Sequence, residues 1–368
     1  MTRARVRDLG ITIGTYPVGP YNAITDVEGV QVGHSTLIYD EPRVARTGVT
    51  VILPRPEAQR RDHCFAGYHS LNGCGEMTGM HWVAESGLLT SPIALTNTHQ
   101  VGTVHDALVQ YAVMRYGSGT FHLSVVAETW DGWLNDADAF HVTQAHVFEA
   151  IEAAASGPVA EGNVGGGTGM ICHDFKGGIG TSSRIVEVKG GHYSVGALVQ
   201  TNYGHYSREL LRVDGVPVGR EIGPAQMQTP FDQPPAGSSI IVVIATDAPL
   251  LPFQCRRLAQ RATIGCARVG CVGHNGSGDL FLAFATGNHI PADADAALDM
   301  QMLPNHHLNP FFEATAEAVE EAILNALTAA ETISGRQGRV AHALPLDQLR
   351  EVMARYGRLE DDNERIPT

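Results

Sequence analysis

The sequence predicts an α/β layered fold, and three observations support this class. Strand-like apolar runs recur along the 368 residues, helix-like patterns alternate with them, and one run, Ile240–Ala245, is apolar without interruption. A strand with no polar face is typical of the centre of a layered protein, because both of its faces must be covered. The chain is also long enough to bury a sizeable core.

The predicted elements follow from hydrophobic periodicity. Strand-like runs occupy residues 29–32, 49–53, 92–96, 123–127, 194–200, 240–245 and 280–286. Helices are predicted at 76–86, 101–116, 143–156, 252–269 and 309–333, each with apolar residues three or four positions apart. No internal repeat or low-complexity linker interrupts this alternation, so we expect a single domain over residues 1–368.

Composition and charge narrow the functional class. The net charge of −14 offers no basic stripe for phosphates, so we expect no nucleic-acid partner. No stretch has the length and apolarity of a membrane span or a signal-peptide core, which predicts no membrane partner and a cytoplasmic location. The six cysteines form no C-x-x-C pair and are expected to be reduced thiols.

Motifs for cofactors and metals are missing as well. The glycine run Gly162–Gly169 lacks the Gly-Lys-Ser/Thr ending of a phosphate loop, so it indicates a tight turn or a lining of backbone amides. The seventeen histidines include no H-E-x-x-H helix motif. We therefore expect neither a metal nor a cofactor.

Two serines directly before the buried run are candidates for chemistry. The segment before them, Met227–Gly237, is rich in proline and is predicted to be an exposed loop, whereas Ser238 and Ser239 open a rigid strand. If the chain were cut before Ser239, a hydroxyl and a new α-amine would share one residue, and the amine could act as the base. From the residues alone, a plain polar strand start explains the pair equally well.

An ordered set of segments resembles one enzyme family. The set is similar to the L-aminopeptidase D-amidase/D-esterase family, the DmpA-type enzymes that include the β-peptidyl aminopeptidases. The segments that carry the resemblance are Gly19–Val27, His69–Gly73, Thr96–His99, Ala127–Gly132, Glu161–Gly169, Val199–Gly204, Ala245–Pro249 and Asn275–Asp279.

The resemblance implies a fold and a maturation step. The fold would be an α/β/β/α four-layer sandwich, similar in layout to N-terminal-nucleophile hydrolases but with different connectivity. One precursor would cut itself into a large chain, 1–238, and a small chain, 239–368, and several precursors would form a homo-oligomer. Family members commonly place glycine directly before the nucleophile. Here Ser238 stands between Gly237 and Ser239, so Ser238 is the second candidate for the nucleophile, with the cut before it.

The resemblance also implies roles for the site residues. Ser239 would be the nucleophile, Ser277 would hydrogen-bond it, and Asp279, where some relatives carry Glu, would orient that second serine. Asn202 would stabilise the oxyanion, and Glu128 would hold the free amine of the substrate. Trp130 stands where some relatives have Tyr, and it would line the substrate site beside Glu128. Without the family, the Asn275–Asp279 segment is also typical of an Asx turn that leads into a strand, and Asn202, which Tyr-Gly follows, is more typical of a turn residue than of an oxyanion donor.

The function implied is a serine aminopeptidase, amidase or esterase that releases N-terminal residues from short peptides, amides or esters with a free amine, through an acyl-enzyme. One alternative is an acyltransferase similar to the ornithine acetyltransferases, which use a threonine nucleophile. Thr246 ends the buried run instead of opening it, which counts against this alternative. The other alternative is a non-catalytic relative that keeps the fold.

Overall fold

Two β-sheets face each other in the computed structural model, which describes residues 2–55, 61–118, 121–231 and 237–360. One sheet has the strand order β1-β2-β5-β6 and the other β4-β3-β12-β11-β10-β9. The first contains β1 (Gln31–Tyr39), β2 (Ala45–Leu53), β5 (Ile93–Asn97) and β6 (Val125–Thr129). The second contains β3 (Asp62–Gly73), β4 (Leu88–Leu89), β9 (Gly178–Val188), β10 (Gly191–Asn202), β11 (Ser238–Thr246) and β12 (Ser277–Pro291).

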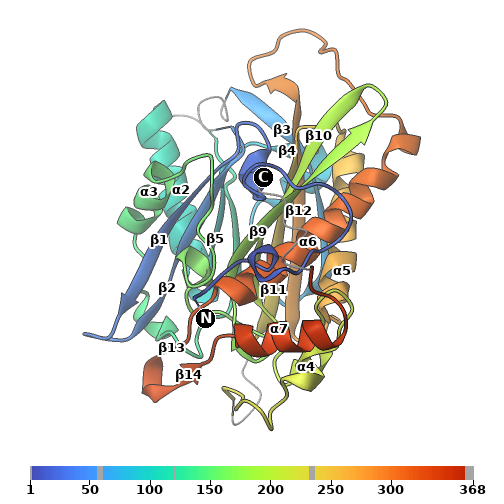
Figure 1. Cartoon of the computed structure of the whole chain (residues 1–368). Helices are drawn as coiled ribbons and strands as arrows, with labels where there is room; N and C mark the ends of the chain where they lie inside the picture. Colours follow the sequence, from blue (N-terminus) through green and yellow to red (C-terminus); the bar gives the residue numbers. More distant parts are fainter. Residues whose placement is uncertain (1, 56–60, 119–120, 232–236, 361–368) are drawn as a thin grey trace.

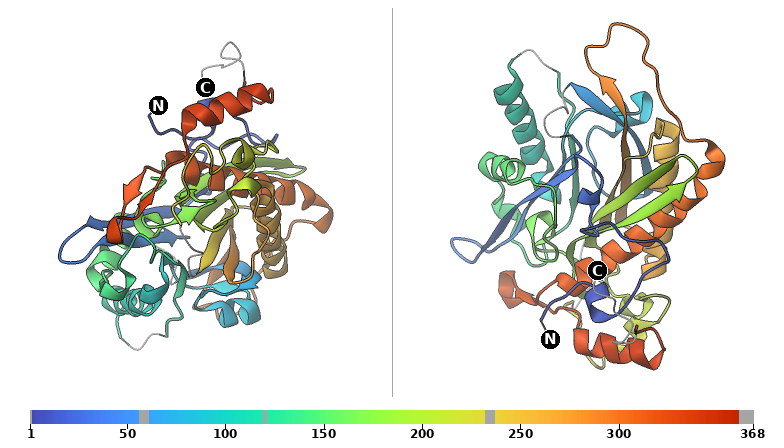
Figure 2. Two further views of the ribbon diagram at one scale, coloured as in Figure 1. Left: turned by 90° about the horizontal axis from the view of Figure 1, so that it is seen from below. Right: turned by 45° about the horizontal axis from the view of Figure 1, so that its top comes forward.

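Helices cover the outer face of each sheet (Figures 1 and 2). Helices α2 (Val101–Tyr116) and α3 (Gln144–Glu152) pack on the four-stranded sheet, and α5 (Pro252–Val269) and α6 (Asn309–Ala329) pack on the six-stranded sheet. The remaining helices are α1 (Met80–Ser86), α4 (Val218–Glu221) and α7 (Leu346–Arg355), and two small ribbons pair β7 (Ile171–Cys172) with β8 (Phe175–Lys176) and β13 (Ile333–Ser334) with β14 (Val340–Ala341). The expected α/β/β/α order is confirmed.

The alternation of side chains along β11 explains why this strand is apolar throughout. Ile240, Val242 and Ile244 belong to the core beneath α5 and α6. Ile241, Val243 and Ala245 belong to the core between the two sheets. Because successive strand residues point to opposite faces, a strand with helices on one side and a second sheet on the other has no solvent-facing position.

Two long strands of the six-stranded sheet were not predicted from the sequence, and their composition explains why. Strand β3 carries polar and small residues at many positions, and β9 opens with the run Gly178–Ser183. These segments form strands because they hydrogen-bond to neighbouring strands. Strand β3 pairs with β12, and β9 pairs with β10 along its whole length. Sheet context therefore overrode a weak local preference.

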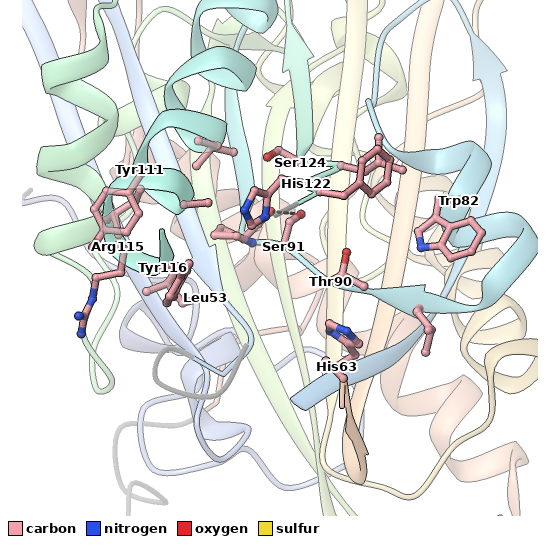
Figure 3. Close-up of a pocket in the computed structure, with 18 of the residues that line it drawn as sticks. Leu53, His63, Trp82, Thr90, Ser91, Tyr111, Arg115, Tyr116, His122 and Ser124 are labelled. Atoms are coloured by element: carbon pink, nitrogen blue, oxygen red, sulfur yellow. Dashed lines mark hydrogen bonds between the residues drawn. The ribbon is translucent and has the colours of Figure 1, made fainter. Parts of the chain in front are cut away.

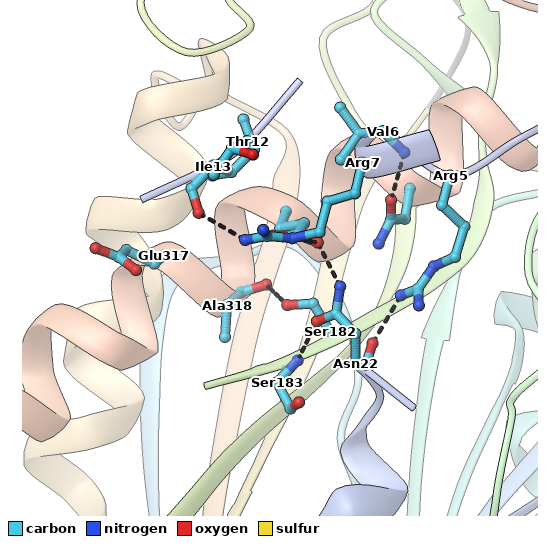
Figure 4. Close-up of polar contacts among 12 residues, drawn as sticks. Arg5, Val6, Arg7, Thr12, Ile13, Asn22, Ser182, Ser183, Glu317 and Ala318 are labelled. Atoms are coloured by element: carbon cyan, nitrogen blue, oxygen red, sulfur yellow. Dashed lines mark hydrogen bonds and ion pairs between the residues drawn. The ribbon is translucent and has the colours of Figure 1, made fainter. Parts of the chain in front are cut away.

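A buried ion-pair network joins the N-terminal segment to α6 and β9. Arg184 is fully buried, and its guanidinium contacts Glu317 at 3.0 Å and Glu321 at 2.7 Å. Arg7 donates to Glu321 at 2.9 Å. It also donates to the Ile13 carbonyl at 3.1 Å (Figure 4). The two arginines together outweigh burial, so the pKa of Glu321 is lowered.

No helix among the described residues is long and apolar enough to cross a lipid bilayer.

Candidate active site

The site lies where three strand ends of the six-stranded sheet meet. Strands β11 and β12 run parallel, and their register pairs Ser238 with Ser277 and Ser239 with Gly278. On the other side of β11, the antiparallel strand β10 ends with Asn202 paired to Ser239. Directly paired residues have Cβ atoms about 5 Å apart. The pairing therefore brings together Ser239, Ser277 and Asn202, three of the residues predicted from sequence.

Strand alternation separates the two candidate nucleophiles. Ser239 has the same parity as Ile241 and Val243 and therefore faces the space between the sheets. Ser238 has the parity of Ile240 and faces the helix layer, where it lines a small cavity with Ser277. Only Ser239 points toward the sheet that carries Glu128.

Backbone groups hold the hydroxyl of Ser239. Its Oγ accepts a hydrogen bond from the Gly278 N–H at 3.2 Å and donates to the carbonyl oxygen of Ser238 at 2.6 Å. Gly278 has no room for a side chain, since a Cβ would lie 2.5 Å from the carbonyl oxygen of Cys74. The close approach of the segment at Cys74 therefore requires glycine beside the candidate nucleophile.

Ser277 and Asp279 form the hydrogen bond that the resemblance implied. The Ser277 hydroxyl donates to Asp279 Oδ1 at 2.7 Å, so the shorter Asp side chain reaches it. Asn72 donates to Asp279 Oδ2 at 3.0 Å. Burial raises the pKa of Asp279, and the two hydrogen bonds oppose that rise. Among the described hydrogen bonds none joins Ser277 directly to Ser239, and the backbone of Gly278 connects them.

Glu128 extends toward the nucleophile from the opposite sheet. It lies near the end of β6, where it accepts hydrogen bonds from the Glu76 N–H at 3.0 Å and from the Thr98 hydroxyl. Gly75 sits between the sheets at this point: a Cβ there would lie 3.1 Å from Glu128 Oε1 and 3.2 Å from the Cα of Gly278. Burial raises the pKa of Glu128, and the two hydrogen bonds oppose the rise.

The side-chain amide of Asn202 is oriented by two backbone groups. Its Oδ1 accepts from the Ile171 N–H at 3.0 Å, and its Nδ2 donates to the Trp130 carbonyl at 2.8 Å. Asn202 has even parity on β10, as does Leu198, which belongs to the core between the sheets. The amide therefore lies on the same face as Ser239, and Nδ2 retains a second proton for another acceptor.

Trp130 lies beside the segment that leads into the site. Gly237 has a left-handed φ of +76°, and a Cβ there would lie 3.0 Å from the Cβ of Trp130. On its other side the indole meets the ring of His99 edge-on, with centroids 4.8 Å apart. Trp130 thus borders the entry to β11, while residues 232–236 of the predicted loop lie outside the described residues.

Neither the glycine run nor the threonine of the acyltransferase alternative contributes to this site. The amides of Gly165 and Gly166 donate to Thr36 and Thr50, so these amides serve a structural turn. The threonine of the acyltransferase alternative, Thr246, sits at the far end of β11 and donates to the Ser194 carbonyl at 2.7 Å. Seven residues separate it from Ser239, or about 23 Å along a strand.

Several residues at the site were not singled out from the sequence. Asn72 and Thr98 lie in segments that carry the family resemblance, yet a polar residue at the end of a predicted strand gives no sign of its partner. Gly75 carries even less signal, because its importance arises from contacts with distant segments. Only the pairing of β3 with β12, and the packing of the two sheets, brings Asn72 and Gly75 to the site.

One apolar cavity lies apart from this site. It has a volume of about 570 Å³ and is bordered by Trp82, Tyr111, Ser91 and Ser124 (Figure 3). Ser91 and Ser124 precede the parallel strands β5 and β6, whereas Glu128 lies near the end of β6. Four residues of strand, about 13 Å, separate the cavity from Glu128.

Comparison with known proteins shows close relatives over nearly the whole chain. The model of peptidase family S58 matches residues 22–341. The beta-peptidyl aminopeptidase BapA of Sphingosinicella microcystinivorans is 47% identical, over 96% of this chain and 93% of its own length.

Solved structures agree with the sequence relatives. A Burkholderia sp. beta-aminopeptidase superposes with a TM-score of 0.90 at 51% identity, over 96% of this chain and 99% of that chain. The L-aminopeptidase D-Ala-esterase/amidase of Ochrobactrum anthropi, described as a prototype for the serine aminopeptidases and a variant of the Ntn hydrolase fold, superposes with a TM-score of 0.91 at 46% identity, over 97% of this chain and 99% of that chain. The chain therefore belongs to peptidase family S58 and is a peptidase with the fold of the serine aminopeptidases.

Proposed function

We propose that this peptidase is a single domain that cuts itself between Ser238 and Ser239 and then removes N-terminal residues from short peptides, amides and esters. The observation that carries the proposal is the position of the Ser239 hydroxyl. It is held by the Gly278 N–H on the face between the sheets, and Gly278 and Glu128 both approach Gly75. A nucleophile and a buried carboxylate are thus close enough to act on one small substrate.

Self-cleavage requires an N-to-O acyl shift. The Ser239 Oγ adds to the carbonyl carbon of Ser238, the C–N bond breaks, and the hydroxyl proton passes to the departing nitrogen. Water then hydrolyses the ester, leaving a carboxylate on Ser238 and a free α-amine on Ser239. The Oγ already lies 2.6 Å from the carbonyl oxygen of Ser238, and a cavity of about 10 Å³, roughly one water in size, is lined by Ser238 and Ser277.

The mature site would then act on substrates with a free amine. The new α-amine, with an ordinary pKa of about 7.7 to 8.0, takes the proton from the Ser239 hydroxyl as it attacks the substrate carbonyl. Glu128 pairs with the substrate ammonium group, and the free Nδ2 proton of Asn202 stabilises the oxyanion. Ser277 and Asp279 orient the nucleophile and its amine. The leaving amine or alcohol departs, and water releases the acyl group.

The names of two relatives support β-amino acid residues as substrates of this enzyme. Two of the similar proteins are described as a beta-peptidyl aminopeptidase and a beta-aminopeptidase, at 47% and 51% identity. A β-residue places one more methylene between the ammonium group and the carbonyl carbon. We therefore expect p-nitroanilides of β-homoamino acids to be hydrolysed, and comparison with the matched L- and D-aminoacyl p-nitroanilides measures the preference.

Mass analysis of the purified protein under denaturing conditions tests the mechanism. We expect two fragments that meet at Ser238/Ser239, and N-terminal sequencing of the small fragment should begin with Ser239. Ser239→Ala should remain one chain without turnover, whereas the matched control Ser238→Ala should still cut and turn over. An intact chain that is fully active, or an active Ser239→Ala variant, would overturn the proposal.

We further propose that the enzyme works in the cytoplasm as a homo-oligomer. All six cysteines are free thiols, as the reducing cytoplasm favours. The oligomer is expected from the family resemblance. Light scattering after gel filtration tests it, and a mass near the single-chain 39.3 kDa would contradict it.

A further inference from the structure

A fully buried lysine lies behind the candidate oxyanion residue. Lys176, on the short strand β8, has no exposed surface. Its Nζ donates to three carbonyl oxygens: that of Gly177 at 2.7 Å, Met170 at 2.8 Å and Gly167 at 3.2 Å. Burial lowers the pKa of Lys176 to about 7. Three acceptors match the three protons of an ammonium group, whereas a neutral amine would turn its lone pair toward a carbonyl oxygen.

One of these carbonyls belongs to the peptide unit that orients Asn202. In the peptide between Met170 and Ile171, the C=O accepts from Lys176 Nζ and also from the Gly177 N–H at 2.9 Å, and the N–H donates to Asn202 Oδ1 at 3.0 Å. The peptide is therefore held at both ends, by the ammonium group and the Gly177 N–H on one side and by the Asn202 amide on the other; of the two donors to the carbonyl, only the ammonium group carries a charge. A planar peptide cannot turn one end without turning the other.

The orientation of the Asn202 amide follows from the hydrogen bonds that hold this peptide. Because the Ile171 N–H requires an acceptor, Oδ1 must face Ile171, and Nδ2 must face the Trp130 carbonyl and the side of Ser239. The buried ammonium group also polarises the peptide, which strengthens its N–H as a donor and, through Oδ1, the Nδ2 protons. A stronger Nδ2 donor stabilises a developing oxyanion more than a neutral carbonyl.

We propose that Lys176 is a positioning residue for the reaction, which acts through the Met170–Ile171 peptide to orient and polarise the Asn202 amide. The inference rests on the proposed function, in which Asn202 stabilises the oxyanion. Lys176 itself touches neither the nucleophile nor the substrate. The signature that separates this role from simple support of the loop is that its effect on kcat depends on the presence of Asn202.

A double-mutant cycle tests the proposal in the full-length, self-processed protein. Lys176→Met keeps most of the side-chain volume and removes the ammonium group. We expect kcat to fall about 10- to 100-fold with little change in KM, the size of effect known for hydrogen-bond partners that orient metal ligands. In the Asn202→Ala background the same substitution should lower kcat by less than about threefold, because non-additivity marks residues that act together.

Thr168→Val is the matched control. Thr168 is buried in the same loop and its hydroxyl donates to the Gly165 carbonyl at 2.7 Å, and none of the described hydrogen bonds joins it to the Met170–Ile171 peptide. It should lower the melting temperature while kcat of the folded enzyme stays near wild type. Equal losses of kcat from Lys176→Met with and without Asn202, or an unchanged kcat, would overturn the proposal.

Two further measurements cover loss of folding or of self-cleavage. The inhibition constant of an amino aldehyde, which forms a hemiacetal on the serine, does not depend on the amount of folded enzyme, and it should rise in Lys176→Met relative to that of the matching amino alcohol. If Lys176→Met yields no folded, processed protein, Lys176→Arg takes its place, because it retains the charge but changes the shape of the group. The inhibition constants of the amino aldehyde and the amino alcohol are then compared for Lys176→Arg and wild type. Ser239→Ala judges the proposed function separately: if it is inactive while Lys176→Met is unimpaired, only the role of Lys176 fails.

Discussion

Replacing Glu128 by Gln tests the proposed amine site most directly, because the substitution removes a charge and keeps the shape. Glu128 is buried, and it accepts hydrogen bonds from Glu76 and Thr98 that a glutamine can largely reproduce, since the Thr98 hydroxyl can rotate to accept. The fold should therefore persist, and self-cleavage, which involves no external amine, should continue.

The expected loss follows from electrostatics. A substrate ammonium group about 4 Å from the carboxylate gains about 4 kcal/mol at an effective dielectric constant of about 20. A glutamine retains one neutral hydrogen bond, worth about 1 kcal/mol. The net loss of about 3 kcal/mol corresponds to roughly a 100-fold decrease in kcat/KM for substrates that carry an amine.

The assay compares two p-nitrophenyl esters that differ only in the amine, alanyl and propionyl, with wild type and Glu128→Gln. The variant should lose the preference for the alanyl ester and leave propionyl hydrolysis near the wild-type rate. Equal losses on both esters would refute the assignment, because they would mean that Glu128 supports the nucleophile and not the amine.

The pH dependence gives a second readout for the same residue. Burial raises the pKa of Glu128, so its charge, and with it the binding of amine substrates, should be lost as pH falls through that raised value. Thr98→Val removes a hydrogen bond that lowers this pKa. The titration of the Ser239 α-amine affects the alanyl and propionyl esters alike, so it cancels in the ratio of their kcat/KM values. The acid limb of that ratio should therefore move to higher pH in Thr98→Val and disappear in Glu128→Gln.

Three other substitutions probe the neighbouring contacts. Asp279→Asn removes a charged acceptor behind the nucleophile and should lower kcat about 10- to 100-fold in steady-state assays of processed enzyme; an unchanged kcat would contradict its orienting role. Glu321→Gln leaves Arg184 short of a charged partner and should cost about 3 kcal/mol in urea unfolding. Because the pKa of Glu321 is lowered in the folded state, its contribution is present above about pH 4.3 and is lost as pH falls, so the variant should show a flatter acid limb of stability. Gly75→Ala should displace Glu128 and lower kcat/KM for substrates with an amine about tenfold, while self-cleavage is retained. Unchanged kcat/KM would show that the space between Glu128 and Gly278 can widen without cost.

Local sequence signals predicted the elements whose environment is uniform. The helices over 101–116 and 252–269 match α2 and α5 residue for residue, because each has a regular apolar stripe against one sheet. Strand β11 was recognisable because both of its faces are buried. By contrast, β3 and β9 form strands because they pair with neighbouring strands, and their own sequences show no strand pattern.

The layered class, the buried strand and the serine pair that opens it could be predicted from the sequence, because buried positions are apolar and this pattern is visible without a structure. The ordered family segments added the roles. The three-dimensional structure was needed to show which serine faces the opposite sheet, how Gly278 and Gly75 let Glu128 approach it, and that Lys176 lies behind Asn202. These are contacts between segments far apart in the chain, and the register of strands and the packing of sheets set them, which no single segment encodes.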